Sequence, residues 1–127
     1  MNVLLVDDEP KNLFALRALL EDLGAAIHCA QSGEEALRQV LKHEYAAILL
    51  DVRMPGIDGY ETAAAIRSLE RLRRVPIIFL SAQDRRTQQR GAHDEHCEFV
   101  QKPLVPDDIR ARVTGLLARR RQTAELQ

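Results

Sequence analysis

Cysteine, long apolar runs and an excess of charge of one sign are scarce or absent in these 127 residues. The two cysteines, Cys29 and Cys97, lack the paired spacing of a zinc site, and we interpret both as packing residues. No stretch approaches the roughly 18 apolar residues of a membrane-spanning helix. A net charge of −1 gives no overall attraction to nucleic acid or anionic lipid. We therefore expect a cytoplasmic protein that binds neither nucleic acid nor membrane directly.

Short apolar runs alternate along the chain with longer segments of helical periodicity. The runs predict strands over residues 3–6, 26–30, 46–51, 77–80 and 98–101, and the periodic segments predict helices over residues 10–23, 33–41, 58–69 and 106–121, with a poorly formed fourth helix within 83–96. This alternation is typical of a doubly wound α/β domain, (βα)5, with a five-stranded parallel sheet covered on both faces. We expect one domain over residues 1–121, followed by a tail or the start of a linker at 122–127.

The run over residues 46–51 is apolar until it reaches Asp51, and the chain then breaks at Pro55 and Gly56. Such a run indicates a strand that is buried on both faces. Ligands of open α/β sheets bind outside the carboxyl ends of the strands, so Asp51 is placed for chemistry. An Asx-turn that ends the strand is the structural alternative.

Polar side chains also follow the other central strands: Asp7 and Asp8 after the first, Ser81 after the fourth and Lys102 after the fifth. Three carboxylates within about 5 Å repel one another by a few kcal/mol per pair, so a cation must offset them. Ligation by oxygen alone favours Mg²⁺. A carboxylate beside Mg²⁺, a lysine and a hydroxyl is the equipment for an aspartyl-phosphate, with Asp51 as the nucleophile.

Four motifs in this order resemble the receiver domains of two-component response regulators, the CheY-like family. They are Leu5-Val6-Asp7-Asp8-Glu9, the stretch from Leu49 through Asp51 to Met54-Pro55-Gly56 and Asp58-Gly59, then Leu80-Ser81-Ala82, and Lys102-Pro103. The resemblance covers nearly the whole chain and implies the strand order 2-1-3-4-5. It also implies a signalling domain that catalyses only its own phosphorylation and dephosphorylation.

The resemblance assigns the site residues. Asp51 is similar to the aspartate that accepts a phosphoryl group from the phosphohistidine of a sensor histidine kinase or phosphotransfer protein. Asp8, Asp51 and the backbone carbonyl of Arg53 are then expected to bind Mg²⁺ directly, and Asp7 to hold a metal-bound water. Lys102 looks like the phosphate-binding lysine, and the family commonly has a cis peptide bond between this residue and the following proline.

Ser81 and Phe99 look like the switch pair of the family. The switch would bias the face formed by the fourth helix, the strand over residues 98–101 and the last helix, a face or helix through which a homodimer could also form. Residues 83–96 offer almost no apolar face, so we expect them to be partly soft and their amides to exchange quickly. Receivers usually carry Gly-Ala where this chain has Glu95-His96.

Five other interpretations are weaker. A phosphatase of the haloacid dehalogenase type would need a second acid where Arg53 stands. A flavodoxin-like nucleotide binder would need a phosphate-cradling loop where the chain has acids at positions 7–9. A degenerate receiver would lack a member of the acidic, hydroxyl and lysine set. Residues 93–97 could bind a metal but are better interpreted as a solvated loop. The arginines at 119–121 could contact nucleic acid but are better interpreted as a helix end.

Overall fold

Five parallel strands form one sheet, in the order β2-β1-β3-β4-β5, in the computed structural model, which describes residues 1–82 and 95–126. The strands are β1 (Asn2–Val6), β2 (Ala26–Ala30), β3 (Ala47–Asp51), β4 (Ile77–Ser81) and β5 (Cys97–Gln101). All neighbouring strands pair in parallel. Each strand lies within one residue of its predicted position at both ends, and the predicted fold class and strand order are confirmed.

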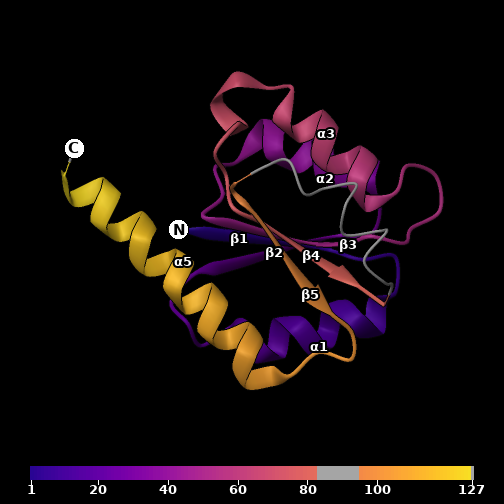
Figure 1. Ribbon diagram of the computed structural model, residues 1–127, viewed down its shortest axis with the longest axis horizontal. Helices are drawn as coiled ribbons and strands as arrows, with labels where there is room; N and C mark the ends of the chain where they lie inside the picture. The colour runs from indigo at the N-terminus through magenta and orange to yellow at the C-terminus, as the bar shows by residue number, and fades with distance from the viewer. Residues whose placement is uncertain (83–94, 127) are drawn as a thin grey trace.

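Helices cover both faces of the sheet (Figure 1). The described helices are α1 (Pro10–Leu20), α2 (Gly33–Lys42), α3 (Gly59–Arg67) and α5 (Pro106–Leu126), with the short 3-10 helix η1 (Glu70–Leu72). Helices α1 and α5 lie on one face, and α2 and α3 lie on the other. The predicted fourth helix and its predicted softness fall mainly on residues 83–94, which lie outside the described residues.

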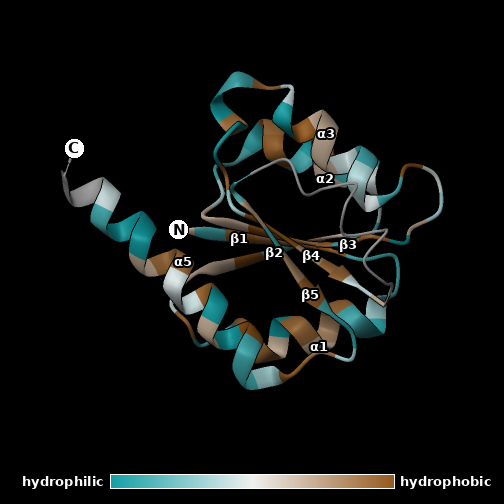
Figure 2. Cartoon of the chain, in the orientation of Figure 1, coloured by the Kyte–Doolittle hydropathy of each residue, from teal (hydrophilic) through white to brown (hydrophobic). Residues whose placement is uncertain are grey.

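Two apolar clusters, one on each face of the sheet, form the core. Successive side chains of a strand point to opposite faces, so Leu4, Leu50 and Phe79 join the cluster beneath α2 and α3, whereas Leu5 and Leu49 join the one beneath α1 and α5. Every residue of β3 and β4 is buried. This double burial explains why the central strands are apolar runs rather than alternating patterns, as the hydropathy colours of Figure 2 show.

The helix starts follow local capping chemistry. The Ser32 hydroxyl accepts a hydrogen bond of 3.0 Å from the Glu35 amide at the start of α2. Asp58 and Glu61 form a capping box at α3, in which each side chain accepts from the other's backbone amide, at 2.8 and 3.1 Å. Such caps stabilise a helix by about 1 kcal/mol each. Both helix starts lie within one residue of their predicted positions. Caps of this kind depend on residues only three positions apart, so they are a local feature of the sequence.

The helix ends differ from the prediction. Helix α1 ends at Leu20 instead of residue 23, and Leu23 packs on the core from the following loop, which then turns through Gly24 with φ of +88°. Helix α3 ends at Arg67 instead of residue 69, and η1 follows from Glu70. Helix α5 continues to Leu126, past the predicted domain end at residue 121. The domain boundary itself stays a prediction.

Candidate functional site

The carboxyl edge of the sheet gathers the polar side chains that follow its strands. Asp51 is the last residue of β3, Ser81 is the last of β4, Asp7 directly follows β1, and Lys102 directly follows β5. Asp7, Asp51 and Ser81 are 1%, 6% and 4% exposed. Carboxylates are almost never this buried unless they are paired or bind a cation. The edge is therefore a polar site enclosed by the ends of the strands.

Three carboxylates converge at this edge. One oxygen each of Asp7, Asp8 and Asp51 lies within 4.8 Å of the others. The ammonium of Lys102 donates a hydrogen bond of 3.0 Å to Oδ1 of Asp51. Burial raises the pKa of Asp51 above its ordinary value; the bond from Lys102 opposes this rise, and the charges of Asp7 and Asp8 add to it.

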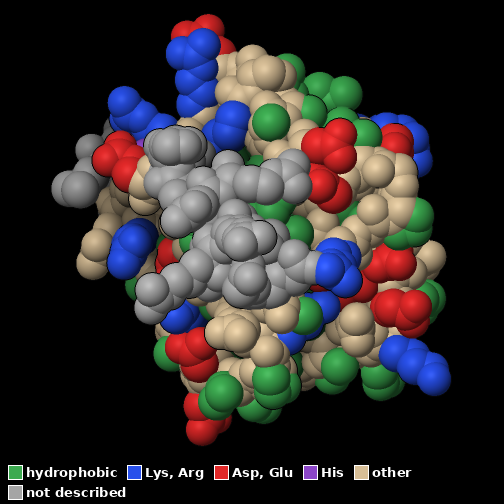
Figure 3. Space-filling view, turned by 45° about the vertical axis from the view of Figure 1, so that its right-hand side comes forward, with side chains coloured by type: hydrophobic (Ala, Val, Ile, Leu, Met, Phe, Trp, Pro, Cys, Tyr) green, Lys and Arg blue, Asp and Glu red, His purple; other side chains and the backbone are tan. Residues whose placement is uncertain are grey.

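This donor set fits a magnesium ion. It offers only carboxylate oxygens, which are the ligands of a hard cation, and it includes no imidazole or thiolate. A cation here would offset the repulsion that raises the pKa of Asp51 and would favour its ionised form. Figure 3 brings forward the side of the molecule toward which the strands run. Acidic side chains gather on the right of this view, and basic side chains lie beside them.

Asp7 is held by two donors. Its Oδ1 accepts a hydrogen bond of 2.9 Å from the backbone amide of Glu9, and its Oδ2 accepts one of 3.1 Å from the side-chain amide of Asn12. Sequence reasoning did not identify Asn12 as part of the site. The available signal was an amide side chain in the first turn of the helix that directly follows the acidic pair.

Gly59 brings the start of α3 against the end of β3. Its amide donates a hydrogen bond of 2.8 Å to the carbonyl of Val52. A Cβ at this position would lie 2.4 Å from the carbonyl oxygen of Asp51. Only glycine permits this close approach, so Gly59 helps to position the end of β3, which carries Asp51. The exposed Arg53 lies in the same turn, and the predicted role of its carbonyl stays a prediction.

The two residues of the predicted switch pair lie on neighbouring strands. Ser81 of β4 is buried, and its carbonyl accepts a hydrogen bond of 2.8 Å from the Lys102 amide. Phe99 of β5 is half-buried and stacks on Phe79, with 5.1 Å between the ring centroids. The peptide bond between Lys102 and Pro103 is cis, as predicted.

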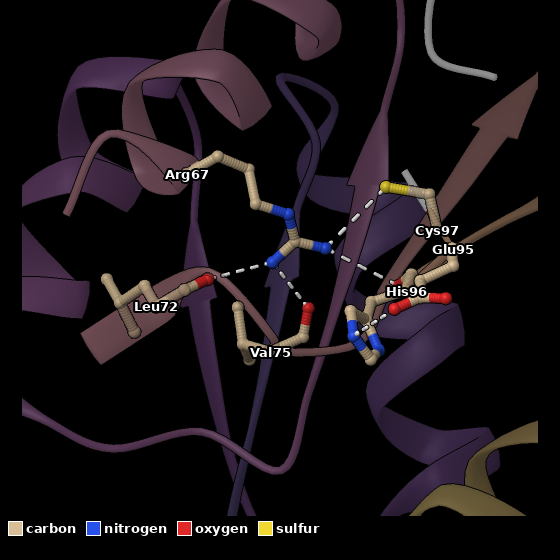
Figure 4. Close-up of polar contacts among 6 residues, drawn as sticks. All are labelled: Arg67, Leu72, Val75, Glu95, His96 and Cys97. Atoms are coloured by element: carbon tan, nitrogen blue, oxygen red, sulfur yellow. Dashed lines mark hydrogen bonds and ion pairs between the residues drawn. The ribbon is translucent and has the colours of Figure 1, made fainter. Parts of the chain in front are cut away.

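Arg67, at the end of α3, ties the start of β5 to the rest of the domain (Figure 4). One of its terminal nitrogens, Nη1, donates hydrogen bonds to the carbonyls of Leu72 and Val75, at 2.8 and 2.6 Å. The other nitrogen, Nη2, donates to the carbonyl of His96 at 3.5 Å and contacts Sγ of Cys97 at 3.6 Å. Arg67 thus anchors the edge strand that carries Phe99 and leads to Lys102. It was not recognised from the sequence.

We predict that replacing Arg67 by methionine lowers the free energy of unfolding by about 2 kcal/mol, because charge-assisted hydrogen bonds to partly buried carbonyls are lost. Urea denaturation followed by circular dichroism measures the change. The matched control is Arg73→Met, in an exposed arginine of the same connection, which should shift stability by no more than about 0.5 kcal/mol. Equal stability of Arg67→Met and the wild type would contradict the anchoring role.

The remaining predictions concern residues away from the carboxyl edge. Cys29 and Cys97 are half-buried and pack against the two core clusters, in keeping with their interpretation as packing residues. Of the possible metal ligands at 93–97, His93 and Asp94 lie outside the described residues, and His96 pairs with Glu95 at 3.5 Å. The arginines at 119–121 are exposed near the end of α5. Among the described helices, none combines the length and the apolar character that crossing a membrane requires.

The fold and the site together define a class: a doubly wound α/β domain with an acidic cluster, a hydroxyl and a lysine at the carboxyl edge of its sheet. The family model of the response regulator receiver domain matches residues 3–114. The chain belongs to this family and is a receiver domain of two-component signal transduction.

Known proteins similar to the chain include the response regulator Rre1 of Synechocystis sp. (strain ATCC 27184 / PCC 6803 / Kazusa), which is 32% identical over 98% of this chain and 55% of its own length. The solved TrrA of Thermotoga maritima, in complex with Mg²⁺ and BeF, has a TM-score of 0.78 and 34% identity over 91% of this chain and 97% of that one. The receiver domain of sensor histidine kinase PA1611 of Pseudomonas aeruginosa PAO1, solved with magnesium in its active-site cleft, has a TM-score of 0.79 and 32% identity over 89% and 93%. The chain spans about half the length of the curated relatives it matches.

Proposed function

We propose that Asp51 is the phosphoacceptor of this receiver domain. The observation that carries the proposal is the pairing of a buried carboxylate at the end of β3 with the ammonium of Lys102 at 3.0 Å, beside two further carboxylates. An oxygen of Asp51 attacks the phosphorus of a phosphohistidine, the phosphorus–nitrogen bond breaks, and the imidazole leaves. Lys102 neutralises charge on the phosphoryl oxygens, and the hydroxyl of Ser81 hydrogen-bonds one of them.

Magnesium is the proposed cofactor. Asp8, Asp51 and the carbonyl of Arg53 would hold it directly, and Asp7 would hold one of its water molecules. When bound, the ion supplies positive charge to the transferring phosphoryl group. The oxygen-only cluster of Asp7, Asp8 and Asp51 supports this choice, as do the similar receiver domains solved with magnesium.

The proposed partner is a sensor histidine kinase or a phosphotransfer protein that meets the domain in the cytoplasm. Phosphorylation would draw Ser81 toward the phosphoryl group and turn Phe99 inward, which biases the face that includes β5 and α5. That face, or α5 alone, is also the proposed surface of a homodimer. The stacking of Phe99 on the core through Phe79 supports this coupling. Output would then depend on what binds this face.

Phosphorylation by a small donor tests the proposal. The wild type, incubated with acetyl phosphate and Mg²⁺, should gain the mass of one phosphoryl group, and Asp51→Asn should gain none. Omitting the metal should prevent the modification of the wild type. The matched control is Asp22→Asn, which removes an exposed carboxylate that pairs with Arg110. Asp22 follows the carboxyl end of α1, whereas the site lies at the start of this helix, so the variant should be labelled normally. Labelling of Asp51→Asn equal to that of the wild type would refute the assignment.

A further inference from the structure

We infer that Asn12 is a positioning residue of the magnesium site, whose side-chain amide holds the Asp7 carboxylate in the orientation that the cation and its water require. The inference rests on the proposed function, because it assumes that magnesium binds at the cluster of Asp7, Asp8 and Asp51. It concerns a residue outside that cluster, in the first turn of α1.

The orientation of Asp7 depends on outside donors. The terminal torsion of an aspartate has broad minima, so the side chain does not set its own carboxylate plane. In this protein the Glu9 amide binds Oδ1 and the Asn12 amide binds Oδ2, which ties down both oxygens. Each oxygen has two lone pairs, so each keeps one for the cation or its water. Without Asn12, only Oδ1 would be held.

The chemical type of the donor suits this role. A neutral amide orients a carboxylate without adding positive charge, whereas a lysine or arginine at position 12 would repel the cation. The ammonium that lies at the site, that of Lys102, already donates a hydrogen bond to Asp51. Hydrogen-bonding partners that orient metal-binding groups change metal affinity about 10–100-fold when they are removed.

The surroundings of Asn12 allow a clean substitution. The residue is exposed and lines, with Asp7 and Lys102, a cavity of about 380 Å³ that is also lined by Leu16 and Leu19. A leucine at position 12 would extend this apolar lining and remove the amide. Leucine also favours helix more than asparagine does, so the variant should fold. Ala15→Leu is the matched control, because Ala15 lines the same cavity and does not donate to Asp7.

Calorimetric titration with MgCl₂ at fixed pH and ionic strength tests the inference. Asn12→Leu should raise the dissociation constant for magnesium about tenfold, while Ala15→Leu should change it by no more than about twofold. The unfolding midpoints of both variants in EDTA should show that they are folded. A dissociation constant for Asn12→Leu equal to that of the wild type would overturn the inference, and a failure of the wild type to bind magnesium would instead overturn the proposed function.

A spectroscopic readout separates positioning from mere support of the loop. At saturating Mg²⁺, the carboxyl carbon resonances of Asp7 and Asp8 should both shift in the wild type. In Asn12→Leu the shift at Asp7 should be reduced and that at Asp8 retained, because only the Asp7 carboxylate has lost a donor. Shifts of wild-type size at both residues, or an equal reduction at both, would show that Asn12 does not act through Asp7.

Discussion

Replacement of Lys102 by glutamine should slow the phosphorylation of Asp51 by about 10²–10³-fold, the usual effect of removing one preorganised group that stabilises transition-state charge. The side chain of Lys102 is only 29% exposed, and its ammonium already lies 3.0 Å from Oδ1 of Asp51, the carboxylate that would form the new bond to the phosphoryl group. Glutamine keeps an N–H donor on a side chain one atom shorter, but it carries no positive charge and cannot neutralise the developing negative charge. The rate of labelling by acetyl phosphate at saturating Mg²⁺ measures the effect.

A second lysine provides the control. Lys42→Gln removes the same charge from the exposed end of α2 and should leave the rate within about twofold of the wild type. The folded state of Lys102→Gln is verified by its unfolding midpoint. If Lys102→Gln were labelled as fast as Lys42→Gln, the lysine would have no part in phosphoryl transfer, and its bond to Asp51 would serve only to neutralise a buried carboxylate.

Replacement of Gly59 by alanine should lower the free energy of unfolding by about 3 kcal/mol, because a methyl group added to a tightly packed region forces the backbone to move. The added Cβ would lie 2.4 Å from the carbonyl oxygen of Asp51 and 2.8 Å from Cα of Val52, and neither backbone atom can move aside cheaply. The end of β3 must shift, so the variant should also accept the phosphoryl group more slowly. Urea denaturation and the labelling rate measure the two effects.

Gly115 offers an internal comparison. It lies within α5, and a Cβ added there meets no atom within 4 Å. Gly115→Ala should therefore stabilise the protein by about 1 kcal/mol, because alanine has the higher helix propensity. A Gly59→Ala variant as stable as the wild type would show that α3 can move away from β3 at no cost.

Local patterns were sufficient to predict much of the fold. The five strands lie within one residue of their predicted ends. The inner strands β1, β3 and β4 are buried on both faces and were recognisable as nearly uninterrupted apolar runs, whereas the partly exposed edge strands β2 and β5 carry weaker patterns. Helix α3 begins within one residue of its predicted start at residue 58, and the capping box of Asp58 and Glu61 that stabilises this start depends on residues three positions apart. The residues proposed for the site were also recognisable, since each of Asp7, Asp51, Ser81 and Lys102 ends or directly follows a strand whose partners run parallel to it.

The sequence by itself therefore determined the elements, their alternation and the polar residues at the strand ends, since each depends on neighbours a few positions away. Only the tertiary structure decided which side chains support that site. The bond from Arg67 to His96 spans 29 positions, and the contact between Gly59 and Asp51 depends on the angle at which α3 meets β3. Such contacts arise from the packing of whole elements against one another, and no local pattern encodes that geometry.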